Sequence, residues 1–184
     1  MSEKEGKLFV ITGPSGVGKG TLVRSLLKSH PQLFVSISAT TRKPRQGEKE
    51  GKDYYFLSQE QFKSMIEEDN LLEWATYAGN YYGTPKQPVL EKINQGKTII
   101  LEIELLGARQ VKENLPQSEL IFILPPSEQE LERRLRNRGS DSPEAISKRL
   151  QRAKEEILAQ DEFDHKIVND QLERAIVQLQ QIII

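Results

Sequence analysis

Residues 7–27 read KLFVITGPSGVGKGTLVRSLL, and this stretch decides the fold. It begins with an apolar run, passes into a loop with four glycines and ends in a segment whose leucines have helical spacing. A strand, a glycine-rich loop and a helix in this order are the context that a phosphate-binding loop requires. Gly13 to Lys19 follow the pattern G-x-x-x-x-G-K, in which backbone N–H groups surround an oxyanion at the positive end of a helix. We therefore predict a phosphate-binding loop at residues 13–19.

The loop departs from the strict pattern at one position. Gly20 follows Lys19 where Ser or Thr is usual, and the hydroxyl comes one residue later, at Thr21. A helix turns by about 100° per residue, so Thr21 approaches a Mg²⁺ ion from a different side. Lys19 supplies a mobile positive charge that can follow a phosphoryl group from donor to acceptor.

Composition limits the class of protein. A chain of 184 residues suits one domain with small insertions and can bury a proper core. It has no cysteine, which excludes disulfides, a cysteine nucleophile and cysteine metal ligands. A net charge of −1 argues against bulk attraction to nucleic acid or to an anionic membrane. No apolar run approaches the length of a membrane span and no signal peptide is recognisable, so we expect a soluble, cytoplasmic protein.

Strands and helices alternate along the chain, which predicts an α/β fold with a mainly parallel sheet covered on both faces. Capping boxes at Ser58–Gln61 and Ser127–Glu130 predict two helix starts. Residues 39–53 are polar and show no apolar periodicity. The expected strands are 8–11, 33–38, 54–56, 98–103, 120–124 and 165–168, with a hairpin at 71–77 and 80–83. The expected helices after the first are 58–68, 85–95, 107–114, 127–138, 142–160 and 172–183.

Two regions do not follow this alternation. Residues 38–84 resemble a small mixed-sheet insertion, and residues 127–160 resemble a helical lid. The remaining residues, 1–37, 85–126 and 161–184, form the expected three-layer core. No repeat and no linker between independent domains is present.

The insertion carries candidate phosphate ligands. Arg42 and Arg45 flank Pro44, which stiffens the backbone, and a guanidinium can bind a phosphate through two hydrogen bonds. A solvated basic turn is the alternative. Tyrosines at 54–55 and 81–82 can donate to a phosphate or stack on a base, although sheet packing explains such residues as well.

Taken together, these segments resemble the guanylate kinase family over nearly the whole chain. The resemblance rests on an ordered set of motifs rather than on one of them. They are GPSGVGKGT (13–21), SATTRKPRQGE (38–48), GKDYYF (51–56), LLEWATYAGNYYGT (71–84), LEIELLGA (101–108), ILPPS (123–127), RNRGSDS (136–142), KRLQRA (148–153) and IVND (167–170).

This resemblance implies a phosphate-loop core, an inserted monophosphate-binding domain and an arginine-bearing lid. It implies that ATP is held by Gly13, Pro14, Ser15, Gly16, Val17, Gly18, Lys19, Gly20, Thr21, Arg134, Arg138 and Asn169. It implies that GMP is held by Ser38, Arg42, Arg45, Tyr54, Glu73, Tyr82, Gly83, Thr84, Glu104, Arg149 and Arg152. Among these residues the expected catalytic ones are Lys19, Arg42, Arg138 and Arg149, and the expected metal cofactor is Mg²⁺, near Thr21 and Glu102, directly or through water.

Glu73, which the resemblance makes the guanine reader, also has a chemical reason for that role. Guanine presents two adjacent donors, N1–H and the exocyclic amine, which one carboxylate can accept as a pair. Adenine presents an acceptor at N1 instead, and a polar group left unpaired in this way can reject the wrong base by a factor of about 10⁴. A surface glutamate beside Trp74 is the alternative interpretation.

Glu102 and Glu104 stand where the family more often has aspartates. Alternation along a strand places both side chains on one side of the strand end. We expect one or both of them to face Mg²⁺-bound waters, the monophosphate or Lys19. Which of the two approaches the metal stays open, and a structural ion pair is the alternative.

The predicted lid gathers arginines at positions 133, 134, 136, 138, 149 and 152. Arg134 and Arg138 share a helix face, as do Arg149 and Arg152, because residues three or four apart are neighbours on a helix. The resemblance favours these four as the residues that close over the phosphates and exclude water. Arg133 and Arg136 are expected to be solvated only, as most helix charges are.

No general base is required, because the second pKa of a phosphate monoester is about 6 and the acceptor oxygen is already largely ionised at neutral pH. His30 and His165 are therefore interpreted as structural. The implied reaction is ATP + GMP → ADP + GDP, with dGMP a second substrate, in a monomer or weak dimer. Two alternatives remain: a non-catalytic guanylate-kinase-like interaction module, and a kinase for another small phosphate acceptor.

Overall fold

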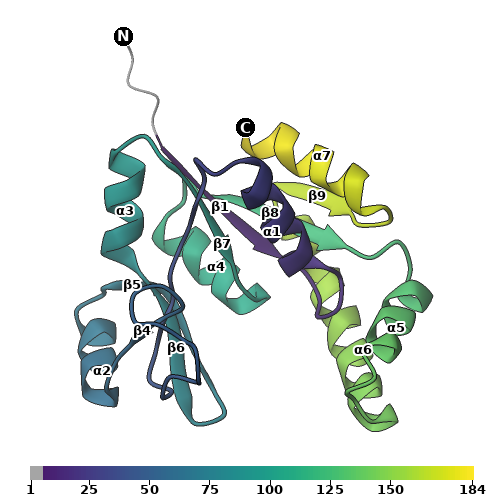
Figure 1. The fold of residues 1–184 in the computed structure, drawn as a ribbon, viewed down its shortest axis with the longest axis horizontal. Coiled ribbons are helices and arrows are strands. Elements are labelled where there is room, and N and C mark those ends of the chain that lie inside the picture. Colours follow the sequence, from purple (N-terminus) through teal and green to yellow (C-terminus); the bar gives the residue numbers. More distant parts are fainter. Residues whose placement is uncertain (1–5) are drawn as a thin grey trace. The chain divides into compact units, whose positions relative to one another are not determined.

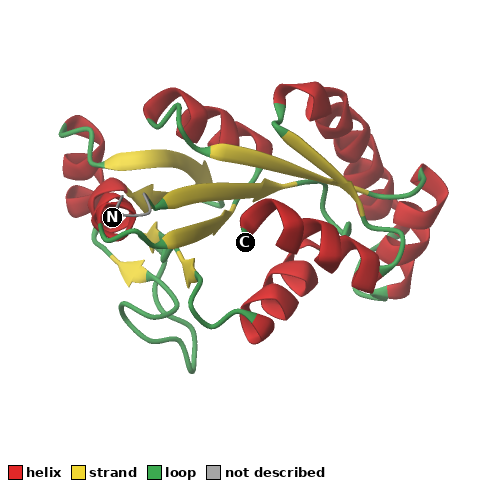
Figure 2. Cartoon of the chain, turned by 90° about the horizontal axis from the view of Figure 1, so that it is seen from above, coloured by secondary structure: helices red, strands yellow, loops and turns green. Residues whose placement is uncertain are grey.

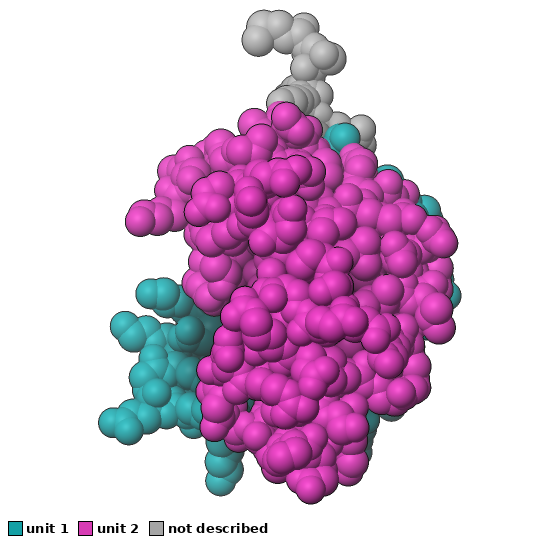
Figure 3. All heavy atoms as spheres, turned by 90° about the vertical axis from the view of Figure 1, so that its right-hand side faces the viewer, with its two compact units in different colours: residues 1–8, 34–101, 106–118 teal, residues 9–33, 102–105, 119–184 magenta. Residues whose placement is uncertain are grey.

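The computed structural model describes residues 6–184, and contacts divide the chain into two compact units (Figure 3). Among the described residues, unit 1 comprises 6–8, Phe34–Leu101 and Leu106–Ser118, and unit 2 comprises Phe9–Leu33, Glu102–Leu105 and Glu119–Ile184. The strands are β1 (Lys7–Thr12), β2 (Phe34–Val35), β3 (Ala39–Thr40), β4 (Tyr55–Phe56), β5 (Leu71–Tyr77), β6 (Asn80–Pro85), β7 (Thr98–Glu102), β8 (Glu119–Leu124) and β9 (His165–Val168). The helices are α1 (Lys19–Ser29), α2 (Gln59–Glu67), α3 (Lys86–Asn94), α4 (Leu105–Asn114), α5 (Glu128–Asn137), α6 (Pro143–Leu158), the 3₁₀ turn Ala159–Glu162 and α7 (Leu172–Ile183).

The larger sheet has the strand order β2-β7-β1-β8-β9. Its paired strands run parallel, as in β1 with β8 (Val10 beside Leu120) and β8 with β9 (Ile123 beside Ile167). Helices lie beside the strands (Figure 2), and α1 contacts α7. The strands are nearly continuous apolar runs because helices cover a parallel sheet on its faces; Val10, Ile11, Ile121 and Ile123 are completely buried.

The smaller sheet, in unit 1, has the order β4-β3-β6-β5. β5 and β6 form an antiparallel hairpin, whereas β3 pairs parallel with β4 and antiparallel with β6. One face of this sheet packs on α2 through an apolar cluster that includes Ala39, Phe62 and Leu71. Tyr81 stacks on the Phe62 ring with centroids 5.1 Å apart, so the odd-numbered positions of β6 face the cluster.

α5 and α6 form a helical hairpin in unit 2 (Figure 1), held by the cluster Leu131, Leu135, Ile146 and Ala153. Serine side chains cap both helices: the hydroxyl of Ser127 accepts from Glu130 N–H, and that of Ser142 accepts from Ala145 N–H. Pro143 stands in the first turn of α6, where no backbone donor is needed.

The observed elements confirm most of the expected ones and correct several. β9 and α7 have the predicted bounds, and the Ser58–Gln61 capping box is complete. The Ser127–Glu130 box is only half formed, because the Glu130 carboxylate binds Arg133 and Arg134 instead. β2 is shorter than the predicted strand 33–38, and β3 lies inside the segment that showed no strand pattern.

Candidate active site

The phosphate-binding loop in unit 2 adopts the predicted strand–loop–helix arrangement. Gly18, the N-cap of α1, has a φ of 99°, a left-handed conformation that favours glycine. A Cβ at Gly18 would also lie 2.6 Å from the Nδ2 atom of Asn169. That same Nδ2 atom donates to the carbonyl of Val17 at 2.8 Å, so Asn169 stabilises the curve of the loop.

Arg134, on α5, holds the same loop. Its guanidinium donates to the carbonyl of Asn169 at 2.8 Å and to that of Val17 at 3.3 Å, while Nε binds Glu130 at 2.9 Å. Arg134 and Asn169, both expected at the ATP site, therefore meet on the loop backbone. In this structure both are engaged in holding the loop.

Lys19 lies half-buried at the start of α1, where its ammonium donates to the carbonyls of Gly13 and Pro14. Burial lowers the pKa of Lys19, and the charges of Glu102, Glu156 and Glu104 oppose that shift. The loop keeps the Lys19 side chain folded back on itself, and an anion can replace these carbonyls as its partner.

A cavity of about 480 Å³ opens over the loop. Its positively charged side chains come from three elements: Lys19 and Arg24 from α1, Arg134 from α5, and Arg138 directly after α5. Glu102, at the end of β7, adds one carboxylate. The remaining lining residues are Pro14, Ser15, Gly16, Gly18, Gly20 and Thr21. The cavity is suited to a polyanion.

Arg152 and Arg149 lie on α6. The guanidinium of Arg152 binds Glu104 and also Glu156, the latter at 3.0 Å, and these two carboxylates raise its pKa. Burial in turn raises the pKa of the Glu156 carboxyl, and Arg152 opposes that shift. Arg149 forms an ion pair with Asp141 at 2.9 Å. Glu104 does not continue the strand as alternation predicted, because β7 ends at Glu102.

In unit 1, the face of the small sheet opposite α2 carries a polar set. Glu73 on β5 pairs with Thr84 on β6, and the Thr84 hydroxyl donates to the Glu73 carboxylate at 2.7 Å. Both residues are buried, and burial raises the pKa of the Glu73 carboxyl, while the Thr84 hydrogen bond opposes that shift. A carboxylate can accept about four hydrogen bonds, so one bond from Thr84 leaves acceptor sites for two adjacent donors of a ligand.

Tyr82 shares that face, since it lies two residues from Thr84 on β6. Its ring packs edge-on against Tyr54, with centroids 6.4 Å apart. Gly83 between them points the other way, where a Cβ would lie 2.7 Å from the carbonyl oxygen of Glu73 and 3.1 Å from the Phe62 ring. Close packing of β6 on β5 and α2 therefore explains the glycine.

Arg42 lies against the Tyr54 ring, with its guanidinium carbon 5.1 Å from the ring centroid. Glu48 binds the two terminal nitrogens of this guanidinium at 2.8 and 2.9 Å and accepts from the backbone N–H of Arg45 at 2.7 Å. Arg42 and the Arg45 N–H lower the pKa of Glu48 to about 2, and Glu48 in turn raises that of Arg42. The Arg45 side chain itself is exposed.

Sequence reasoning missed three residues that organise these sites. Glu48 fixes Arg42, and its only signal was its place in the motif of residues 38–48. Gln110 on α4 binds the backbone N–H and carbonyl of Trp74, both at 3.0 Å, and thereby covers β5, the edge strand of the small sheet. Arg24 lies one turn beyond Lys19 and gave no signal as a single helix charge.

A glycine loop that joins the first parallel strand to a helix, beneath a cavity lined with cations, defines a nucleotide-binding protein of the phosphate-loop class. The family model described as guanylate kinase matches residues 5–184. The chain belongs to the guanylate kinase family.

Individual relatives agree with this assignment. Guanylate kinase from Synechocystis sp. is 60% identical over 97% of this chain and 94% of that protein, and the one from Thermosynechococcus vestitus is 62% identical over 95% and 92%. The crystal structure of guanylate kinase from Anaplasma phagocytophilum superimposes with a TM-score of 0.75 at 33% identity, covering 100% of this chain and 87% of that one. Shikimate kinase from Bacteroides thetaiotaomicron, at 15% identity and a TM-score of 0.50 over 96% and 97% of the chains, shares the fold alone.

Proposed function

We propose that this protein transfers the terminal phosphoryl group of ATP to GMP, and also to dGMP, giving ADP and GDP or dGDP. The observation that carries the proposal is the buried Glu73–Thr84 pair, which lies on the same sheet face as Tyr82. A carboxylate in such a place accepts the two donors of guanine and leaves adenine unpaired. A protein-interaction module without catalysis needs neither this pair nor an intact Lys19 loop.

We assign the site residues in two sets, following the family resemblance. The donor set is the loop from Gly13 to Thr21 with Arg134, Arg138 and Asn169. The acceptor set is Ser38, Arg42, Arg45, Tyr54, Glu73, Tyr82, Gly83, Thr84, Glu104, Arg149 and Arg152. The cavity over the loop supports the first set, and the Arg42–Tyr54–Tyr82 cluster supports the second. The three-part division into core, insertion 38–84 and lid 127–160 is part of the same proposal.

The chain performs phosphoryl transfer through alignment and charge. Lys19 leaves the loop carbonyls to bind the transferring phosphoryl group, and Arg138 and Arg149 balance the charge that spreads over its oxygens. Arg42, fixed by Glu48, orients the GMP phosphate as the nucleophile. An ionised GMP oxygen bonds to the γ-phosphorus, the bond from that phosphorus to the bridging oxygen breaks, and the electron pair leaves on ADP.

The donor atoms present fit a Mg²⁺ ion bound mainly by phosphates and water. No group of three or more His, Cys, Asp or Glu among residues 6–184 could hold a metal alone. The carboxylate of Glu102 and the hydroxyl of Thr21 both line the cavity, and Mg²⁺ at kinase sites commonly uses one or two protein oxygens beside the substrate phosphates. When bound with ATP, the ion would neutralise negative charge on the phosphates.

No helix formed by the described residues is long and apolar enough to span a membrane. A cytoplasmic location, a monomer or weak dimer, and the absence of nucleic-acid partners remain predictions made from the sequence.

An ADP-release assay of the wild-type protein with ATP and each of GMP, dGMP, AMP, UMP and CMP tests the function. We expect ADP release with GMP and dGMP only. Equal rates with AMP would contradict the role of Glu73, and no release with any acceptor would contradict the kinase assignment.

A further inference from the structure

We propose that Arg24 is a donor-site residue that binds the β- and γ-phosphate oxygens of ATP, in the space that the side chain after the loop lysine fills in the strict pattern. This inference deepens the proposed function, on which it rests. It assigns a guanidinium to a position where the phosphate-loop pattern provides a hydroxyl.

The first observation is the space above Gly20. A Cβ built at Gly20 would lie 3.2 Å from Nη1 of Arg24 and 3.8 Å from Oε1 of Glu102. The backbone of Gly20 needs no glycine, because its φ is outside the left-handed region. The missing side chain therefore leaves room that the Arg24 guanidinium occupies.

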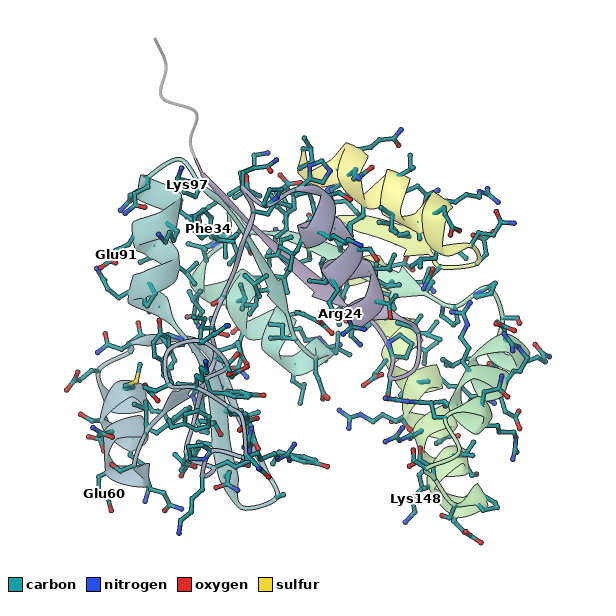
Figure 4. All side chains as sticks on the ribbon, viewed as in Figure 1. Arg24, Phe34, Glu60, Glu91, Lys97 and Lys148 are labelled. Carbon is teal, nitrogen blue, oxygen red and sulfur yellow. The ribbon has the colours of Figure 1, made fainter. Side chains whose placement is uncertain are left out.

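The second observation is where that guanidinium lies. Arg24 projects from α1 (Figure 4) and lines the cavity of about 480 Å³ together with Lys19 and Glu102. Its Nη2 donates to the Thr21 hydroxyl at 3.3 Å. The exposed head group thus lies at the mouth of the phosphate loop.

The third observation is how weakly Arg24 is held compared with the other cations of the cavity. Arg134 is bound to two backbone carbonyls and to Glu130, and Lys19 to two carbonyls of the loop. For Arg24, the contact with Thr21 is the one hydrogen bond recorded among residues 6–184, and it has no ion pair there. Most of its five donors therefore remain for a ligand.

A guanidinium in place of a hydroxyl changes which part of Mg²⁺-ATP this position can bind. A hydroxyl at position 20 can bind a metal ion, whereas a guanidinium binds phosphate oxygens directly and often through two hydrogen bonds. The contact also occupies the Thr21 hydroxyl, which then has less freedom to coordinate a metal. We infer that donor-phosphate binding in this protein depends less on Mg²⁺ than in a chain with the strict pattern.

Titration calorimetry with ATP, ADP and AMP tests this, for wild type, Arg24→Gln and the control Lys28→Gln. Lys28 is an exposed cation one turn further along α1 and does not line the cavity. Each titration is run with Mg²⁺ and with EDTA. Arg24→Gln removes one charged hydrogen-bonding partner, so its affinity for ATP and for ADP in EDTA should be about tenfold lower than that of wild type. AMP, which lacks both phosphates, should bind equally to all three proteins.

A second variant tests whether the Arg24 guanidinium replaces the hydroxyl that the strict pattern has at position 20. In the Arg24→Gln background, Gly20→Ser restores the hydroxyl of the strict pattern, so ATP affinity should recover with Mg²⁺ and stay low in EDTA. Unchanged ATP affinity in Arg24→Gln, an equal loss for AMP, or no recovery in the double variant would each overturn the inference. Wild-type turnover of GMP is measured in parallel, so failure of the kinase assignment is recognised separately from failure at Arg24.

Discussion

Lys19 is the single residue on which turnover should depend most. Lys19→Met keeps most of the aliphatic stem and removes the charge that binds the transferring phosphoryl group. We expect turnover to fall by at least about 100-fold, while the protein still folds. Steady-state kinetics and the thermal midpoint measure the two effects. A folded variant with near-normal turnover would show that the loop does not serve phosphoryl transfer.

Glu73 should control which base is accepted. Glu73→Gln turns one of two acceptors into a donor, so one hydrogen bond to guanine becomes a donor–donor clash. Charged hydrogen bonds contribute about 1.5–3 kcal/mol each, so kcat/KM for GMP should fall at least about tenfold. IMP keeps N1–H but lacks the exocyclic amine, so its kcat/KM should fall less than that of GMP. The ratio of kcat/KM for GMP to that for AMP should also become smaller. An equal change for all three nucleotides would make Glu73 a structural residue.

Glu73→Gln should lower activity but raise the thermal stability of the nucleotide-free protein. Burial raises the pKa of the Glu73 carboxyl above its ordinary value, so the folded protein holds this proton to higher pH than the unfolded chain does. Stability is therefore lost as pH rises from the unfolded value through the folded one. Without nucleotide, Glu73→Gln should unfold at a higher temperature than wild type at pH 8, and the difference should disappear near pH 4.

At the scale of elements, the loop of residues 41–54 depends on Glu48 to present Arg42. Glu48→Gln removes a charged two-point contact, so we expect KM for GMP to rise by about tenfold with KM for ATP unchanged. Glu60→Gln, on the exposed side of α2 (Figure 4), is the matched control. The pKa of Glu48 is lowered to about 2, so its stabilising contribution is present above the unfolded value and lost as pH falls toward 2. An unchanged KM for GMP in Glu48→Gln would show that GMP binding does not depend on the position of Arg42.

Elements with strong local signals were predicted well. α7 and β9 have the predicted bounds because turn residues isolate an amphipathic helix and a short apolar strand. β3 was missed because its two residues pair with β4 and β6, which lie far along the chain, and local periodicity cannot report such pairing. For the same reason the contacts of Gln110 with Trp74, which is 36 residues away, were not predicted. The contacts of Arg24 with Thr21 and of Glu48 with Arg42 are local, but a single charge in a helix or a polar loop gives no pattern that distinguishes a site residue from a solvated one.

At the scale of the whole molecule, the proposed donor set lies entirely in unit 2, whereas the proposed acceptor set has residues in both units. The phosphate loop and Arg138 lie in unit 2, and Arg42, Arg45 and Glu73 lie in unit 1. Glu104, Arg149 and Arg152 of the acceptor set also lie in unit 2. The acceptor residues of unit 1 are therefore separate from the donor set, and their substitution should leave ATP binding intact.

Arg45→Ala and Arg138→Ala test this separation. Both side chains are exposed, so truncation should leave the core of each unit undisturbed. Arg45→Ala removes a cation from the acceptor set, so GMP affinity should fall about tenfold while ATP affinity stays the same. Arg138→Ala removes a charge that acts on the transferring group, so turnover should fall and GMP affinity should not. Calorimetric titration of each variant with GMP alone and with ATP alone, beside steady-state turnover, distinguishes the two effects. If both variants lost GMP affinity equally, the acceptor site would extend to Arg138, and the assignment of Arg138 to the donor set alone would be wrong.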